Sequence, residues 1–214
     1  VTTPMHIIPT GLPDHQFIRG DGQRFRAEYN IAPERKIALF VGRAAFEKNI
    51  GFLLDVIHHA RTQRPDILLV IAGEGPALES LQRKARQLNL NSHVRFVGYL
   101  PRETALKDCY AAADVFTFAS RTETQGLVLL EALAVGVPVL ALPALGAAEI
   151  INPQRGAVSA IDAPNTFAHQ RVALLDQPER MATLSQEGIA FAREWDAATQ
   201  ATQLANLYHS LARK

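Results

Sequence analysis

Residues 124–148 read TQGLVLLEALAVGVPVLALPALGAA, and Glu131 is the single charged residue among them. The apolar run before Gly136 predicts a buried helix, and the run after Pro138 predicts a buried strand. An unpaired polar group in such surroundings costs roughly 2–7 kcal/mol, and an unpaired charge costs more. Glu131 therefore requires a partner, which is either a bound polar ligand or a distant arginine or lysine. Glu123, on the loop that leads into the helix, favours a polar ligand at the helix N-terminus.

Outside this stretch, short apolar runs alternate with helical patterns. We expect strands at residues 37–41, 67–72, 94–97, 115–118 and 139–142, and a weaker strand at 157–160. We expect helices at residues 49–63, 77–90, from Pro101 onward, at 127–135 and throughout the region after Pro164, ending in an amphipathic helix at 197–213. Strands that are apolar on both faces and joined by helices predict an α/β, Rossmann-like parallel sheet flanked by helices.

Composition excludes several classes of protein. The chain has 214 residues and a formal net charge of +1, which argues against a nucleic-acid surface built on bulk positive charge. The single cysteine, Cys109, permits no internal disulfide, so a reduced, cytosolic setting is the default, and we expect Cys109 to be a small core residue. No signal peptide and no apolar run of about 18 residues is visible. The chain begins at Val1 rather than Met, so we expect that it was cut from a longer protein.

Glycines and charged residues gather where the expected strands end. They are Gly42 and Arg43 after the first strand, residues 73–75 after the second, Gly98 and Tyr99 after the third, and residues 121–125 after the fourth. In open parallel sheets, ligands bind beyond the carboxyl ends of the strands. The sequence therefore predicts a site along this edge of the sheet.

Each group at this edge has a chemical and a plain interpretation. Arg43 and Lys48 are suited to clamp a diphosphate, or they are two solvated surface cations. Gln125 and Gly126 open an apolar helix whose backbone N–H groups suit a phosphate, or they are an ordinary helix start. The glycines at 73–75 do not form the G-x-G-x-x-G fingerprint, and a tight turn explains them equally well.

Four segments carry a resemblance to a known family. They are VGRAAFEKN (41–49), VIAGEGP (70–76), VRFVGYLP (94–101) and TETQGLVLLEALAVGVPVLA (122–141). Their order and separation resemble the retaining glycosyltransferases of family 4, the group 1 enzymes with the two-domain GT-B architecture. From about Ile7 to its end, the chain is similar to the carboxyl-terminal, nucleotide-sugar-binding domain of these enzymes.

The resemblance implies a role for each residue of the site. Arg43 and Lys48 would hold the diphosphate and stabilise its growing charge, Glu123 would lie beside the donor sugar, and Glu131 would bind the ribose hydroxyls. Arg43, Lys48 and Glu123 would be the catalytic residues. The remaining donor-binding residues would be Gly42, Glu74, Tyr99 and Leu100 together with the backbone of Thr124, Gln125, Gly126, Leu127 and Val128. The resemblance implies neither a cofactor nor a metal.

The resemblance also implies an organisation. Residues 1–30 would be an irregular interdomain segment, residues 31–194 the donor-binding domain, and residues 195–214 the C-terminal helix. The N-terminal acceptor domain would be absent from this chain and would be its partner. That domain could place the full enzyme on the inner face of the cell membrane.

The expected function is transfer of a hexose, with UDP-glucose as the indicated donor, to a lipid or saccharide acceptor in a bacterial pathway. One departure bears on the sugar: family members often carry Gly-Gly-x-x-Glu where residues 144–149 read ALGAAE. Two alternatives remain open, a non-catalytic nucleotide-binding module and a UDP-sugar epimerase of the same architecture. A dehydrogenase is disfavoured by the missing dinucleotide fingerprint.

Overall fold

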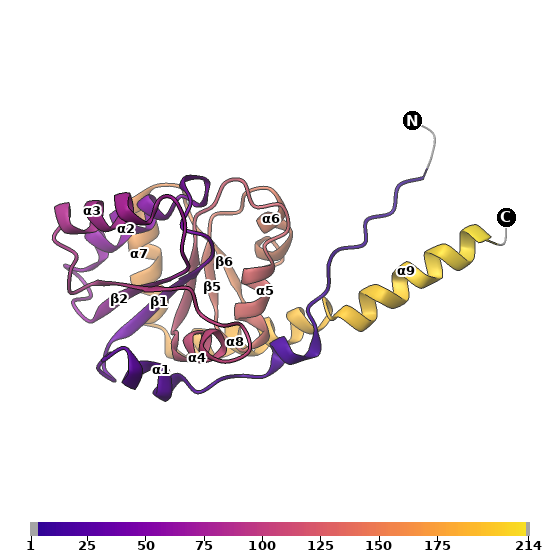
Figure 1. The fold of residues 1–214 in the computed structure, drawn as a ribbon, viewed down its shortest axis with the longest axis horizontal. Coiled ribbons are helices and arrows are strands. Elements are labelled where there is room, and N and C mark those ends of the chain that lie inside the picture. The colour runs from indigo at the N-terminus through magenta and orange to yellow at the C-terminus, as the bar shows by residue number, and fades with distance from the viewer. Residues whose placement is uncertain (1–3, 213–214) are drawn as a thin grey trace.

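The computed structural model describes residues 4–212 and has a parallel sheet at its centre (Figure 1). In the described chain the sheet has six strands in the order β3-β2-β1-β4-β5-β6. Their bounds are β1 Lys36–Val41, β2 Ile67–Ala72, β3 Val94–Gly98, β4 Val115–Phe118, β5 Val139–Ala141 and β6 Ala157–Ser159. The Rossmann-like class is confirmed, and the weaker strand predicted at 157–160 is the edge strand β6.

Helices cover both faces of the sheet. The bounds of those that follow β1 are α2 Ile50–Ala60, α3 Leu78–Gln87, α4 Ala105–Ala112, α5 Leu127–Ala134, α6 Gly146–Ile151, α7 Pro164–Leu175, α8 Pro178–Arg193 and α9 Ala197–Ala212. α2, α3 and α7 lie on one face, and α4, α5 and α8 lie on the other (Figure 1). α9 extends away from the sheet and leaves Leu204, Tyr208 and Leu211 exposed. Residue 213, with which we expected this helix to end, lies outside the described residues.

Two expectations about local structure were wrong, and three short elements were not predicted. The helix predicted from Pro101 begins only at Ala105, because residues 102–104 form a turn. The segment 1–30 is not irregular throughout: α1 (Gly22–Glu28) is capped by the side chain of Asp21 and buries Phe25. Short 3-10 turns (η1, Asp14–Phe17; η2, Phe46–Lys48) and the six-residue helix α6 were also missed.

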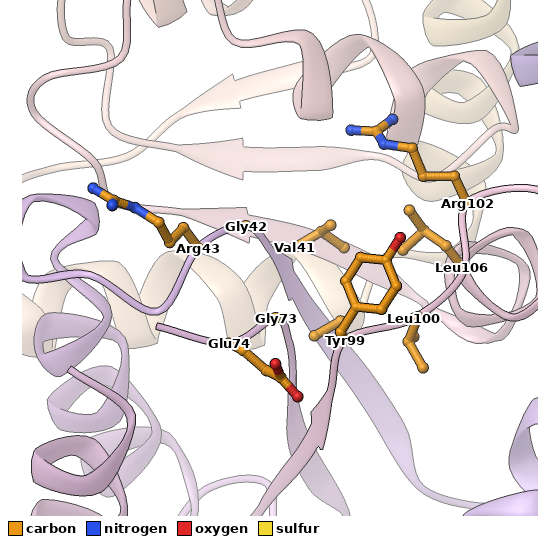
Figure 2. Close-up of a pocket in the computed structure, with 10 residues that line it drawn as sticks. Val41, Gly42, Arg43, Gly73, Glu74, Tyr99, Leu100, Arg102 and Leu106 are labelled. Atoms are coloured by element: carbon orange, nitrogen blue, oxygen red, sulfur yellow. The ribbon is translucent and has the colours of Figure 1, made fainter. Parts of the chain in front are cut away.

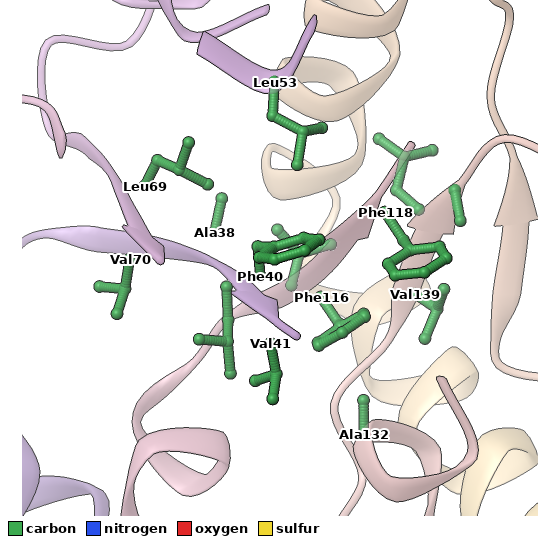
Figure 3. Close-up of a cluster of buried hydrophobic side chains, with 14 of the residues drawn as sticks. Ala38, Phe40, Val41, Leu53, Leu69, Val70, Phe116, Phe118, Ala132 and Val139 are labelled. Atoms are coloured by element: carbon green, nitrogen blue, oxygen red, sulfur yellow. The ribbon is translucent and has the colours of Figure 1, made fainter. Parts of the chain in front are cut away.

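The hydrophobic core lies between the central strands and the helices on both faces (Figure 3). Phe40 and Phe118 stack with their ring centroids 5.9 Å apart, which ties β1 to β4. Cys109 belongs to this core as predicted, and burial raises the pKa of its thiol. The strand order reverses between β1 and β4, so the loops after these two strands diverge and leave a crevice.

The N-terminal segment is bonded to the junction of α8 and α9 at Leu12. The Leu12 N–H donates to the Trp195 carbonyl at 2.7 Å, and the Ala197 N–H donates to the Leu12 carbonyl at 2.8 Å. Leu12 itself is buried. These bonds hold the N-terminal segment against the junction of α8 and α9, and both segments leave the body on the same side (Figure 1).

Candidate functional site

The turns after β1 and β2 form the floor of the crevice. Gly42 has φ 153° and Gly73 has φ 141°, a region that side chains with a Cβ rarely adopt. A Cβ on Gly73 would lie 1.9 Å from the carbonyl oxygen of Gly42. The two turns therefore touch backbone to backbone, and a glycine at position 73 is what permits this contact.

A pocket of about 290 Å³ opens above these turns. Its walls are mostly apolar, and its lining residues are Val41, Gly42, Arg43, Ala72, Gly73, Glu74, Tyr99, Leu100, Arg102 and Leu106. Figure 2 shows Arg43 on one side of this pocket and Arg102 with the Tyr99 ring on the other. An apolar cavity with a few polar groups at its margin is typical of a small-molecule site. We call it the first pocket.

A second pocket of about 340 Å³ shares Val41, Gly42 and Arg43 with the first. Its other lining residues are Lys48, Phe118, Glu123, Thr124, Gln125, Gly126, Leu127 and Val128. The shared residues make the two pockets neighbours along the edge of the sheet. The second pocket differs in chemistry, because it combines a lysine, a carboxylate and the N-terminus of α5.

Lys48 and Glu123 form an ion pair in the second pocket, with Nζ 2.8 Å from Oε2. Both side chains are largely shielded, at 23% and 16% exposure. Glu123 also accepts the Gly126 N–H at 3.3 Å, immediately before the first residue of α5. Burial alone would raise the pKa of Glu123, but the Lys48 bond and charge together with backbone N–H groups outweigh it and hold that pKa below its ordinary value. Lys48 is therefore not a solvated surface cation.

Arg43 lies at the margin that the two pockets share, and its side chain is 64% exposed. Its Nη2 is 2.5 Å from Oε1 of Glu47, one helical turn further along the chain. The side chain is long and is held by one exposed partner. The structure thus brings Arg43 and Lys48 to the same edge, with Arg43 exposed and Lys48 largely shielded from solvent.

The partner of Glu131 is within the protein. Glu131 is 4% exposed; its Oε1 accepts from Nη1 of Arg102 at 2.7 Å, and its Oε2 accepts from the Tyr110 hydroxyl at 2.9 Å. The distant-arginine alternative is thus what the structure shows, and burial of this carboxylate alone does not require a ligand. Arg102 connects Glu131 to the first pocket, whose wall it forms. Every other predicted site residue lines one of the two pockets.

Sequence reasoning missed Arg102, Tyr110 and Leu106. Arg102 lies in the loop after the third strand, immediately after Pro101. Charged residues in the loops after the other strands were predicted to belong to the site, and the same signal applies to Arg102. It was missed because residues from Pro101 onward were assigned to a helix and not to the loop. Tyr110 lies within α4 in the run LKDCYAAA, where spacing gives no signal.

The loop 142–146 supports the second pocket from outside. The Gly146 N–H donates to the Glu123 carbonyl at 3.0 Å, and a Cβ on Gly146 would lie 1.8 Å from the Thr124 carbonyl oxygen. The preceding Leu145 has φ 47°. Position 146 therefore requires glycine, because the backbone at Thr124 leaves no room for a side chain.

Gly146→Ala is expected to destabilise the protein by about 1–3 kcal/mol, because the added methyl group must displace the loop that carries Glu123. In a chain of this size that is a fall in Tm of about 3–10 °C. Gly51→Ala is the matched control, since a Cβ there would meet only the Lys84 side chain at 3.6 Å. Thermal unfolding of both variants is the measurement, and equal Tm values for the two would contradict the close approach at Gly146.

Among residues 4–212, no group of three or more His, Cys, Asp or Glu side chains is placed to hold a metal ion. No helix in the same part of the chain combines the length and apolar character required to cross a membrane.

Comparisons with known proteins bear on the site just described. The family model described as Glycosyl transferases group 1 matches residues 21–191. The alpha-monoglucosyldiacylglycerol synthase of Streptococcus pneumoniae is 37% identical over 147 residues, which cover 66% of this chain and 33% of that protein. The GDP-mannose-dependent alpha-(1-6)-phosphatidylinositol monomannoside mannosyltransferase of Mycolicibacterium smegmatis is 34% identical over 214 residues, which cover 94% of this chain and 55% of that protein.

Solved structures share the fold. A crystal structure of Anabaena HepE in complex with UDP superposes with a TM-score of 0.87 at 20% identity, covering 96% of this chain and 57% of that one. The chain spans between 33% and 55% of the length of the two curated relatives above.

Proposed function

The chain belongs to the glycosyl transferases group 1 family, and from that premise we propose that it is the donor-binding half of a retaining glycosyltransferase. Residues 31–194 bind a nucleotide sugar, residues 1–30 lead in from an N-terminal acceptor domain, and the C-terminal segment from residue 195 contains α9 (Ala197–Ala212). One observation carries the proposal: an apolar pocket and a pocket with Lys48 and the N-terminus of α5 meet at Gly42 and Arg43. A nucleoside diphosphate sugar likewise has a base with ribose at one end, a diphosphate in the middle and a sugar at the other end.

In this arrangement the base and ribose occupy the first pocket. The diphosphate lies at the shared margin, where Arg43 and Lys48 reach it and the first N–H groups of α5 point at it. Helix geometry leaves those N–H groups without acceptors in their own helix, and the helix dipole favours an anion there. The sugar lies beside Glu123.

The chemistry follows from the charges. As the bond between sugar and diphosphate breaks, negative charge grows on the leaving group and positive charge grows on the anomeric carbon. Lys48 has three N–H donors, so it keeps Glu123 at 2.8 Å and still donates to the diphosphate. Glu123 stabilises the oxocarbenium-like centre. The acceptor hydroxyl attacks the anomeric carbon from the face that the diphosphate leaves, and the departing phosphate oxygen takes the hydroxyl proton, so the configuration is retained.

We propose UDP-glucose as the donor and a lipid or saccharide as the acceptor, in a bacterial pathway. The name of the Streptococcus pneumoniae relative describes glucosylation of a diacylglycerol lipid, and HepE was crystallised with UDP. The Mycolicibacterium smegmatis relative depends on GDP-mannose, so the base and the sugar are part of the test. The acceptor site, and any attachment to the inner face of the membrane, belong to the proposed N-terminal domain.

The test is a calorimetric titration with UDP, UDP-glucose, GDP-mannose and NAD, made on the wild-type chain and on Glu131→Ala. We expect UDP and UDP-glucose to bind and the variant to bind them about 10–100-fold more weakly, as is typical when a hydrogen bond to a charged group is lost. Glu131→Gln keeps the shape of the side chain and separates loss of binding from loss of folding.

The other outcomes are equally informative. Binding of GDP-mannose alone would change the donor but keep the proposal. NAD binding, or no binding by the full-length protein either, would overturn it. Donor cleavage with transfer of glucose distinguishes the transferase from a non-catalytic module and from an epimerase, whose product would be an epimerised nucleotide sugar.

A further inference from the structure

A cluster of three polar residues, Arg102, Tyr110 and Glu131, lies between α4, α5 and the first pocket. Glu131 and Tyr110 are 4% and 3% exposed, whereas the side chain of Arg102 is 55% exposed. The hydrogen bond to Glu131 and its charge raise the pKa of Arg102, and burial followed by the charge of Glu131 raises the pKa of Tyr110. The cluster therefore contains a carboxylate, a cation and a neutral hydroxyl.

Charge balance requires Arg102 to stay in place when a ligand binds. A buried carboxylate without a cation is costly, and a neutral ligand hydroxyl cannot supply the missing charge. If a nucleotide displaced Arg102, it would have to overcome that cost. Arg102 is therefore part of the binding surface that the ligand meets, not a group that the ligand replaces.

Both the carboxylate of Glu131 and the guanidinium of Arg102 can form further hydrogen bonds. Each carboxylate oxygen accepts about two hydrogen bonds, and Arg102 and Tyr110 use one on each oxygen of Glu131. A guanidinium has five N–H donors, and the recorded bond to Glu131 uses one of them. A carboxylate acceptor and a guanidinium donor side by side match a hydroxyl, which donates and accepts at once.

Arg102 also lies where it can meet a nucleotide. It lines the first pocket together with Tyr99, Leu100 and Leu106, on the side of the pocket opposite Arg43 (Figure 2). A nucleotide whose diphosphate is near Arg43 and whose base lies against the apolar wall places its ribose toward this cluster. This step rests on the proposed function of the two pockets.

We propose that Arg102 is a specificity-determining residue that reads the ribose hydroxyls of the donor nucleotide. Its guanidinium donates to a ribose hydroxyl oxygen while Glu131, fixed by Arg102 and Tyr110, accepts a hydrogen bond from the same hydroxyl. A site built in this way rejects an analogue that lacks the hydroxyl, because the donor and the acceptor are then left unpaired.

The test compares the Kd of UDP with those of 2′-deoxy-UDP and 3′-deoxy-UDP, measured on the full-length protein. We expect wild type to bind at least one deoxy analogue about 10-fold or more weakly than UDP. Arg102→Met keeps the length of the stem but removes the charge, and it is expected to reduce that preference to about threefold or less. Arg83→Met, at an exposed arginine on α3, is the matched control and keeps the full preference.

The ratio of the Kd of a deoxy analogue to the Kd of UDP distinguishes recognition of the hydroxyls from a merely structural role. If Arg102 only stabilises the loop, Arg102→Met binds UDP and its deoxy analogues more weakly by the same factor. The ratio then stays at its wild-type value, which would overturn the proposal. Inorganic pyrophosphate binding is expected to be equal in wild type and Arg102→Met, because the diphosphate site is untouched. Equal affinity of wild type for UDP and both deoxy analogues would also overturn it.

A second variant protects the test against misfolding. Arg102→Lys keeps the charge that Glu131 needs but lacks the planar fork that spans a carboxylate and a hydroxyl. We expect it to fold and to lose at least about threefold of the preference. Failure of wild type to bind any nucleotide is a different result, because it overturns the proposed function itself and not the assignment of Arg102 alone.

Discussion

Lys48→Ala is expected to lower the turnover of the full-length enzyme by about 10²–10³-fold, the loss of about 3–4 kcal/mol of transition-state stabilisation. In the proposed reaction the leaving diphosphate gains charge as its bond to the sugar breaks, and a cation already in place stabilises that charge without reorganisation. Lys48 meets this requirement, because its side chain is 23% exposed and is held by Glu123 at 2.8 Å. Arg43→Ala is expected to have a loss of the same order.

The measurement is UDP release from UDP-glucose, with kcat and KM determined separately. An interaction that strengthens in the transition state lowers kcat more than it raises KM. Lys84→Ala is the matched control: Lys84 forms a comparable half-shielded ion pair with Asp55 at 2.7 Å, between α2 and α3 and outside both pockets. Near-wild-type turnover in both Lys48→Ala and Arg43→Ala would exclude the phosphate clamp.

The edge of the sheet where the pockets lie could be predicted because it depends on short-range pattern. Runs such as residues 67–72 are apolar on both faces, which identifies buried parallel strands. Parallel strands have their carboxyl ends at one edge of the sheet. The residues that follow each strand are therefore predicted to lie at that edge, even when they are far apart in sequence. Lys48 and Glu123 are 75 positions apart, yet strand topology alone brings them to the same pocket.

The partners of Glu131 could not be predicted in the same way. The sequence marked a buried carboxylate that required a partner, but Arg102 is 29 positions away and Tyr110 is 21. Their approach depends on how α4 packs beside α5, and on the turn that delays α4 until Ala105. Short helices such as α6 were missed for a related reason, because six residues are too few for a helical period to show.

Arg171→Met is expected to raise the free energy of unfolding by about 2–4 kcal/mol, because it removes a buried charge that has no partner. Arg171 lies in α7 and is 0% exposed. Within residues 4–212, none of its three side-chain nitrogens has a hydrogen-bond partner. Methionine is unbranched and apolar, so it fills most of the same space without the charge. In a chain of this size the gain corresponds to a rise in Tm of about 5–15 °C.

The pH dependence of stability tests the cause of this effect. Burial lowers the pKa of Arg171 from its ordinary value to about 9 in the folded chain. Between these values the unfolded state holds more protons than the folded state, so the stability of wild type rises with pH in that window relative to the variant. The advantage of Arg171→Met is thus complete below about pH 9 and shrinks above it. Arg180→Met, at an exposed arginine on α8, is the control and is expected to leave Tm unchanged. A lower Tm for Arg171→Met than for wild type would mean that Arg171 contributes an attractive interaction, and the account of an unpaired buried charge would be wrong.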